Sequence, residues 1–144
     1  MTFNILVLDD EPWQLTWVED LARAFDGTCR FTPTFDEAVA QFDLQQPDLA
    51  IVDIRIGEVS DAPKGATLEG ADADWIGLRF LRFVRVERKS NIPMFVYTGL
   101  DRQRLQTIVE SSFRARFFTK FESALLARAL RETFKRLASR ENAG

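Results

Sequence analysis

The feature of this sequence that most limits its fold is a set of five short strand-like runs, each of which stops at a polar residue or a proline. The first run stops at Asp9 and the third stops at Asp53. Short apolar runs of this kind are typical of strands that are buried on both faces of a parallel sheet. The five runs are residues 3–8, 28–32, 49–52, 94–97 and 116–119.

Segments with helical signals separate these runs. Pro12 stands where a first helical turn tolerates proline, and Thr34 with Glu37 matches a capping box. Further helices are expected over residues 75–89 and 102–112, and a last one follows a possible cap at Ser123. Four-residue spacing predicts one apolar helix face from Trp13, Trp17, Leu21 and Phe25, with both tryptophans in the core. It predicts a second apolar face from Leu126, Leu130, Phe134 and Leu137.

Strand and helix therefore alternate five times along the chain. Such alternation favours an α/β fold in which helices cover both faces of a parallel sheet. We predict a doubly wound, five-stranded sheet in a single domain over residues 1–144, because the length suits one domain.

Composition excludes several classes of function. The chain has no histidine, so it cannot hold a Ser-His-Asp triad or a His-ligated metal, and it cannot itself be a histidine phosphodonor. One cysteine, Cys29, rules out an intramolecular disulfide, fits a cytoplasmic location and is expected to be a packing residue. The net charge of -3 gives no general attraction to nucleic acid, and no run is long enough for membrane insertion.

Chemically active side chains follow four of the predicted strands. Asp9 and Asp10 follow the first, Asp53 the third, Thr98 the fourth and Lys120 the fifth. Ligands of open parallel α/β sheets bind at the carboxyl ends of the strands. We therefore expect these residues to form one site.

This set of groups indicates phosphoryl chemistry with a divalent cation. Clustered carboxylates repel one another, and Mg²⁺ is a hard cation that prefers such oxygen ligands. A carboxylate beside the cation can attack a phosphoryl group while Lys120 offsets the charge of the transferring oxygens. The Thr98 hydroxyl can donate a hydrogen bond to one of those oxygens, and Gly99 leaves room beside it.

From about residue 3 to residue 137 the sequence resembles the response-regulator receiver domains of two-component signalling. The resemblance rests on the acidic pair Asp9-Asp10, on Asp53 after an apolar strand, and on Thr98 and Lys120 at the family's spacing. It implies a flavodoxin-like three-layer sandwich. It also implies that Asp53 is the phosphoacceptor and that Phe117, three residues before the lysine, is an aromatic switch residue paired with Thr98.

The resemblance further implies a metal site and protein partners. Asp10, Asp53 and the main-chain carbonyl of Arg55 would ligate Mg²⁺, with Asp9 assisting through water. A histidine kinase or a histidine phosphotransfer protein would donate the phosphoryl group. Phosphorylation would then change the surface around the fourth predicted helix, the fifth strand and the last helix. Because the sequence ends soon after that helix, we expect output through a downstream protein partner, without direct nucleic-acid contact.

Three features depart from the family pattern. The loop before Gly77, which matches the glycine that opens the family's third helix, is longer by roughly 16 residues. Phe121 stands where the family has a proline after the lysine, and a large cation, Arg55, lies two residues after Asp53. A cis non-proline bond costs about 2.5–4 kcal/mol, which favours a trans bond at Phe121.

The long loop covers residues 57–74 and is acidic, with five acids against Lys64. These charges would repel an anionic phosphodonor over a Debye length of about 8 Å. Two interpretations remain equal: a partial lid or partner-recognition element, and a tolerated surface insertion.

Two other classes of function are weighed. The first is a phosphorylation-independent binding module, favoured by the long loop, Arg55 and Phe121. The second is a Mg²⁺-dependent phosphatase with an aspartyl nucleophile; such enzymes typically need an acid where this chain has Arg55.

Basic residues on two predicted helices are given the simpler interpretation of solvated faces. The first set drifts around its helix in three-residue steps, and the second has protein contact as its main functional alternative. The first set is Arg79, Arg82, Arg85 and Arg88, and the second is Arg128, Arg131, Lys135 and Arg136.

Overall fold

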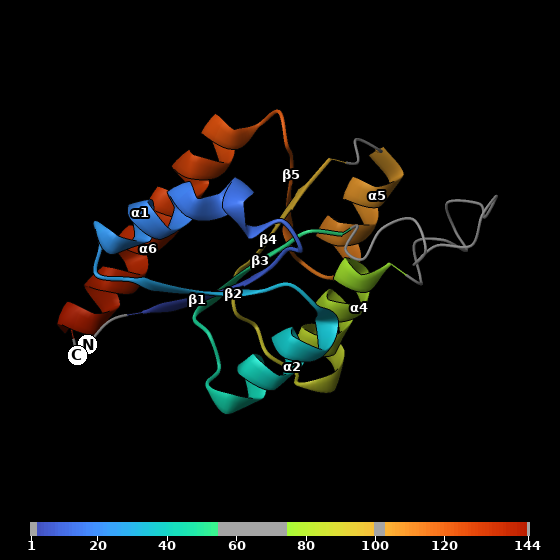
Figure 1. Ribbon diagram of the computed structural model, residues 1–144, viewed down its shortest axis with the longest axis horizontal. Helices are drawn as coiled ribbons and strands as arrows, with labels where there is room; N and C mark the ends of the chain where they lie inside the picture. Colours follow the sequence, from blue (N-terminus) through green and yellow to red (C-terminus); the bar gives the residue numbers. More distant parts are fainter. Residues whose placement is uncertain (1–2, 55–74, 100–102, 144) are drawn as a thin grey trace.

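The computed structural model describes residues 3–54, 75–99 and 103–143, and contains a five-stranded parallel sheet in the order β2-β1-β3-β4-β5 (Figure 1). The strands are β1 (Asn4–Leu8), β2 (Thr28–Thr32), β3 (Leu49–Val52), β4 (Met94–Thr98) and β5 (Arg116–Thr119). The central strands β1, β3 and β4 are almost wholly buried, as their apolar sequences predict. The predicted α/β sheet is confirmed.

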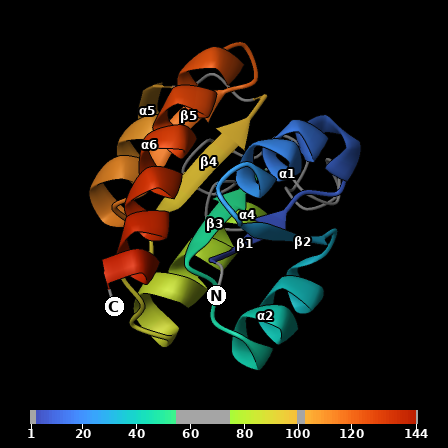
Figure 2. The same cartoon turned by 90° about the vertical axis from the view of Figure 1, so that its left-hand side faces the viewer.

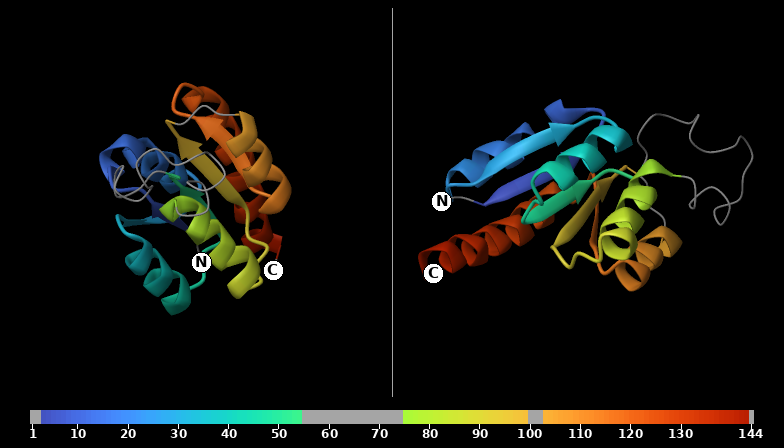
Figure 3. Two further views of the ribbon diagram at one scale, coloured as in Figure 1. Left: turned by 90° about the vertical axis from the view of Figure 1, so that its right-hand side faces the viewer. Right: turned by 90° about the horizontal axis from the view of Figure 1, so that it is seen from below.

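Helices cover both faces of the sheet (Figures 1 and 2). On one face lie α1 (Thr16–Arg23) and α6 (Ser123–Ala143), and on the other lie α2 (Phe35–Leu44), α4 (Ile76–Arg82) and α5 (Gln103–Thr107). Figure 3 shows α4 between α2 and α5. Each face has its own apolar cluster, so the core is divided by the sheet into two layers.

The helix signals in the sequence have physical counterparts. The Thr34 hydroxyl accepts a hydrogen bond from the Glu37 backbone N–H at 3.2 Å, which is the predicted cap of α2. All four apolar residues predicted for the last helix are buried. That helix begins at Ser123 itself, one residue earlier than a Ser123 cap would require.

The predicted apolar face of the first helix is wrong in part. Residues Pro12–Leu15 form a tighter 3₁₀ turn, η1, and the α-helix begins only at Thr16. A 3₁₀ turn rotates its side chains differently from an α-helix, so Trp13 does not share a face with Trp17. Trp13 is 67% exposed, whereas Trp17 is half-buried against the core. The buried stripe consists instead of Leu15, Val18 and Ala22.

The predicted solvated face of arginines is also wrong in part. Arg85 is half-buried, and its guanidinium donates to the backbone carbonyls of Phe113 at 2.7 Å, Ser90 at 2.9 Å and Arg114 at 3.2 Å. It thereby joins the ends of two wide helical segments that continue α4 and α5, η3 (Phe83–Glu87) and η4 (Ile108–Ser112). Arg85 has a structural role.

Three further predictions concern Cys29, the long loop and membrane-spanning segments. Cys29 is half-buried against the α1/α6 cluster, as expected for a packing residue, and burial raises the pKa of its thiol to about 12. Loop 57–74 and Arg55 lie outside the described residues. Among the helices that the structure describes, none is long and apolar enough to cross a membrane.

Candidate functional site

The carboxyl end of β1 presents the acidic pair. The Asp9 backbone N–H donates to the Thr32 carbonyl at 3.1 Å, which continues the ladder between β1 and β2 by one residue. The Asp9 side chain is 1% exposed, and its Oδ1 accepts a hydrogen bond from the Glu11 N–H at 2.8 Å. Its Oδ2 is buried and has no hydrogen-bond partner among the described residues. A buried carboxylate oxygen without such a partner calls for another source of positive charge.

Asp53 follows β3 directly and is fixed by backbone contacts. Its N–H donates to the Leu8 carbonyl at 2.9 Å, and its side chain is 12% exposed. Gly77, near the start of α4, packs against this turn and donates its N–H to the Ile54 carbonyl at 3.1 Å. A Cβ at Gly77 would lie 2.3 Å from the Asp53 carbonyl oxygen. The sequence therefore needs a glycine there, as the family resemblance predicts.

The three predicted acids of the site lie together. Asp9, Asp10 and Asp53 each offer a carboxylate oxygen, and these oxygens all lie within 4.8 Å of one another. Burial raises the pKa of the Asp9 carboxyl, and the nearby Asp10 charge adds to this. The Glu11 N–H and the Lys120 ammonium oppose the shift without cancelling it. The cluster is therefore short of positive charge.

Lys120 follows β5 and reaches the same cluster. Its N–H donates to the Thr98 carbonyl at 2.9 Å, which holds the two strand ends together. Its Nζ lies 3.5 Å from Asp9 Oδ2 and 3.6 Å from Asp53 Oδ2. One ammonium cannot neutralise three carboxylates. Both distances also exceed the length of a charge-assisted hydrogen bond, which is normally about 2.7–2.9 Å.

Thr98 and Phe117 occupy the adjacent strand positions. Thr98 is fully buried at the end of β4 and pairs in register with Thr119 of β5. Phe117 is 7% exposed and belongs to the apolar cluster beneath α4 and α5. Its ring therefore lies inside the protein.

The sequence did not point to two residues that contact Lys120. The Gln14 side-chain carbonyl accepts a hydrogen bond from Lys120 Nζ at 2.6 Å. The ring of Tyr97 lies beneath the same ammonium, with 4.9 Å from Nζ to the ring centroid. Phe121, after the lysine, is joined by a trans peptide bond and is 90% exposed. No local pattern connects Gln14 to Lys120, whereas Tyr97 could have been suspected because it precedes Thr98.

The donor set suits a hard divalent cation. Three carboxylates at one sheet edge, one of them with a buried oxygen that accepts no hydrogen bond from the described residues, match the oxygen ligands that Mg²⁺ prefers. The residues present thus fit the predicted metal, with Asp10 and Asp53 as candidate direct ligands. The proposed main-chain ligand, Arg55, lies outside the described residues.

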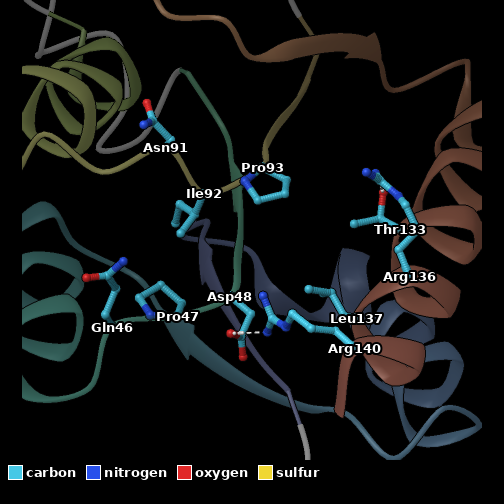
Figure 4. Close-up of a pocket in the computed structure, with 10 residues that line it drawn as sticks. All are labelled: Gln46, Pro47, Asp48, Asn91, Ile92, Pro93, Thr133, Arg136, Leu137 and Arg140. Atoms are coloured by element: carbon cyan, nitrogen blue, oxygen red, sulfur yellow. Dashed lines mark hydrogen bonds and ion pairs between the residues drawn. The ribbon is translucent and has the colours of Figure 1, made fainter. Parts of the chain in front are cut away.

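A separate cleft lies at the other end of the sheet (Figure 4). It has a volume of about 520 Å³ and is lined by the residues that precede β3 and β4 and by the second half of α6. The Arg140 guanidinium pairs across it with Asp48 at 2.9 Å. None of the predicted site residues that the structure describes lines this cleft, and those residues lie at the carboxyl edge.

Many solved structures similar to this chain are receiver domains. A CheY-like response-regulator receiver domain from Methanospirillum hungatei has a TM-score of 0.69 and 18% identity, and 100% of both chains is covered. The signal receiver domain of a DNA-binding response regulator from Colwellia psychrerythraea has a TM-score of 0.70 and 14% identity, with 92% of this chain and 98% of that one covered. A receiver domain from Clostridium thermocellum has a TM-score of 0.66 and 17% identity, with 98% of each chain covered.

This chain has the receiver-domain fold. No family model and no curated protein matches the sequence, so the likeness is one of structure. In this fold the carboxyl ends of β1, β3, β4 and β5 meet at one edge, and here they bring Asp9, Asp53, Thr98 and Lys120 together.

Proposed function

We propose that this chain is a phosphoacceptor switch of a two-component or phosphorelay system, in a single receiver domain over residues 1–144. The observation that carries the proposal is the position of Asp53, whose carboxylate lies beside two further acids and 3.6 Å from the Lys120 ammonium. A nucleophilic carboxylate, a cation-binding acid pair and a lysine are the groups that such a transfer needs.

The proposed reaction is a transfer onto the Asp53 carboxylate. An Asp53 oxygen forms a bond to phosphorus while the bond from phosphorus to the donor nitrogen, or to the donor oxygen of an acyl phosphate, breaks. The Lys120 ammonium offsets charge on the transferring oxygens, and the buried Thr98 hydroxyl donates to one of them. Mg²⁺, held by Asp10 and Asp53 with Asp9 assisting, supplies further neutralisation when bound. The domain would catalyse only this transfer and the hydrolysis of its own acyl phosphate.

The proposed partners follow from the same chemistry. The chain has no histidine, so a phosphohistidine donor has to be another protein segment, in a histidine kinase or a phosphotransfer protein. The acyl phosphate on Asp53 would bias Thr98 and Phe117, and through them the surface of α5, β5 and α6, toward a downstream protein partner. A cytoplasmic location is part of the proposal, supported by the half-buried free thiol of Cys29.

The test is labelling by acetyl phosphate with Mg²⁺, measured by intact mass. Wild-type protein should gain the mass of one phosphoryl group, and Asp53→Asn should gain none. Asp48→Asn, an aspartate at the other end of the sheet, is the matched control and should label like the wild type. Equal labelling of wild type and Asp53→Asn would refute the role of Asp53.

A second candidate function is a binding module that acts without phosphorylation. The observation in its favour is Phe121, a large apolar side chain that is 90% exposed immediately after Lys120. A phenylalanine this exposed leaves its ring accessible for contact with another protein. Failure of the wild type to bind Mg²⁺ or to accept a phosphoryl group would favour this function.

A further inference from the structure

Among the residues that the structure describes, the Lys120 ammonium has one short polar contact and two long ones. Its Nζ lies 2.6 Å from Gln14 Oε1, but 3.5 Å from Asp9 Oδ2 and 3.6 Å from Asp53 Oδ2. Electrostatic attraction alone would draw an ammonium toward the carboxylates until it reached about 2.7–2.9 Å. A neutral amide therefore holds the ammonium closer than either negative charge does.

The orientation of the Gln14 amide is fixed by its two partners. Its Nε2 donates to the Glu11 carboxylate, and its Oε1 accepts from Lys120. A carboxylate can only accept and an ammonium can only donate, so the reverse orientation of the amide would lose both bonds. The Gln14 N–H also donates to the Glu11 carbonyl at 3.1 Å within η1, which fixes the backbone from which the amide extends.

Tyr97 limits the ammonium on another side. Its ring centroid lies 4.9 Å from Nζ, a distance at which a cation and an aromatic face attract each other. Its hydroxyl donates to the Lys120 carbonyl at 3.4 Å, and the side chain is buried. The lysine is thus held at both its main chain and its side chain.

We infer that Gln14 is a positioning residue that holds the Lys120 ammonium away from the Asp53 oxygen until a phosphoryl group arrives. Without Gln14 the ammonium would close onto Asp53 Oδ2 as a tight ion pair, and that oxygen would then be less available for attack. With Gln14 in place, the ammonium stays near enough to meet the oxygens of an incoming phosphoryl group. This inference rests on the proposed function of Asp53 as phosphoacceptor.

The first test compares two glutamines that have similar settings. Gln14 and Gln106 are both exposed, and each donates its amide N–H to a glutamate. Gln14→Met should lower the rate of labelling by acetyl phosphate at saturating Mg²⁺ by about tenfold, which is less than the roughly 100-fold that a 1 Å misplacement can cost. Gln106→Met should label at the wild-type rate. Both variants should unfold at the wild-type temperature, because the changed side chains are on the surface.

A conservative variant distinguishes positioning from a general effect on structure. The double variant Glu11→Gln with Gln14→Glu keeps an acceptor for the Lys120 ammonium and a donor–acceptor pair between positions 11 and 14, so it should retain most of the wild-type rate. Wild-type labelling in Gln14→Met, or equally slow labelling in Gln14→Met and the double variant, would overturn the inference.

The second test does not depend on phosphorylation. In crystal structures without metal, Lys120 Nζ should move in Gln14→Met to within about 2.7–2.9 Å of Asp53 Oδ2, the length of a charge-assisted hydrogen bond. An ammonium that keeps its wild-type position would overturn the inference whatever the labelling shows. If wild-type protein is not labelled at all, the proposed function fails, and these structures still decide whether Gln14 positions Lys120.

Discussion

The two ends of the sheet use charged residues in different ways. At the amino end, Asp48 accepts hydrogen bonds from the Asn4 backbone N–H at 2.8 Å and from the Arg140 guanidinium at 2.9 Å. Arg30, in the edge strand β2, donates to Asn4 Oδ1 at 2.7 Å and to the Gln45 carbonyl at 2.6 Å. These polar groups join β1 and β2 to the turn before β3 and to the last helix.

At the carboxyl end, acids gather with fewer partners. Asp9 Oδ2 is buried without a hydrogen bond from a described residue, and Lys120 stays 3.5 Å away from it. Charges that repel one another in a buried place destabilise the fold unless something from outside neutralises them. Charged side chains at the amino end thus hydrogen-bond to the backbone and to one another, whereas at the carboxyl end a buried carboxylate oxygen lacks a hydrogen bond from the described residues.

The largest difference between the two ends is expected in Mg²⁺ affinity. Asp10→Asn should weaken Mg²⁺ binding by about 100-fold, because it removes one of few direct oxygen ligands and even outer partners of a ligand are worth 10–100-fold. Asp48→Asn, the same change at the amino end, should leave the affinity as it is. Titration calorimetry measures both. Unchanged affinity in Asp10→Asn would refute its role as a ligand, and an equal loss in both variants would remove the difference between the ends.

The packing of the site can be tested at two glycines. A Cβ at Gly77 would lie 2.3 Å from the Asp53 carbonyl oxygen and 2.4 Å from Ile54 Cα, and backbone atoms cannot move aside cheaply. Gly77→Ala should lower the free energy of unfolding by about 2 kcal/mol. At Gly99 the nearest atom to a Cβ is Lys120 Cγ at an ordinary 3.9 Å, so Gly99→Ala should change stability by no more than about 0.5 kcal/mol.

Urea denaturation of the two variants gives both values. Equal stability of Gly77→Ala and Gly99→Ala would show that the turn after Asp53 is not rigid. In that case the close packing of α4 on the site would not explain the glycine.

Local signals in the sequence determined most of the fold. The predicted strand 28–32 and the predicted strand 116–119 are both present with those bounds. Pro33, which cannot donate to a strand ladder, follows the first, and the polar Lys120 follows the second. The role of Trp13 could not be predicted in this way, since four-residue spacing does not reveal that η1 is a 3₁₀ turn. Arg85 looked like part of a regular stripe, and only the wide turns of η3 and η4 bring backbone carbonyls within its reach.

The site residues that follow the strands could be predicted from the sequence, whereas the hydrogen bond between Gln14 and Lys120 could not. Asp9, Asp53, Thr98 and Lys120 meet because parallel strands end at one edge, a rule that needs no side-chain detail. The bond between Gln14 and Lys120 joins residues 106 positions apart. Its formation depends on how η1 is turned, and the sequence carries no local signal for that.

The smallest expected effect is a change in the free energy of unfolding that has opposite signs at the two ends of the sheet. In metal-free buffer at neutral pH, Asp9→Asn should raise the free energy of unfolding by about 1 kcal/mol, because it removes a buried charge whose burial outweighs its pairing with Lys120. Asp48→Asn should lower the free energy of unfolding by about 1 kcal/mol, because it weakens hydrogen bonds to a charged acceptor. The same substitution thus has opposite effects at the two ends.

Low pH and saturating Mg²⁺ should each cancel the gain in the free energy of unfolding that is expected for Asp9→Asn. Burial raises the pKa of the Asp9 carboxyl in the folded state, so folding is penalised above that pKa and the penalty disappears as pH falls through it. The advantage of Asp9→Asn over the wild type should therefore shrink as pH is lowered from 7 toward the ordinary pKa of an aspartate. Saturating Mg²⁺ should also erase it, because a ligand that binds only the folded state stabilises the wild type. An advantage that persists at low pH and with Mg²⁺ would mean that charge is not the cause, and the contrast between the two ends would then be one of packing alone.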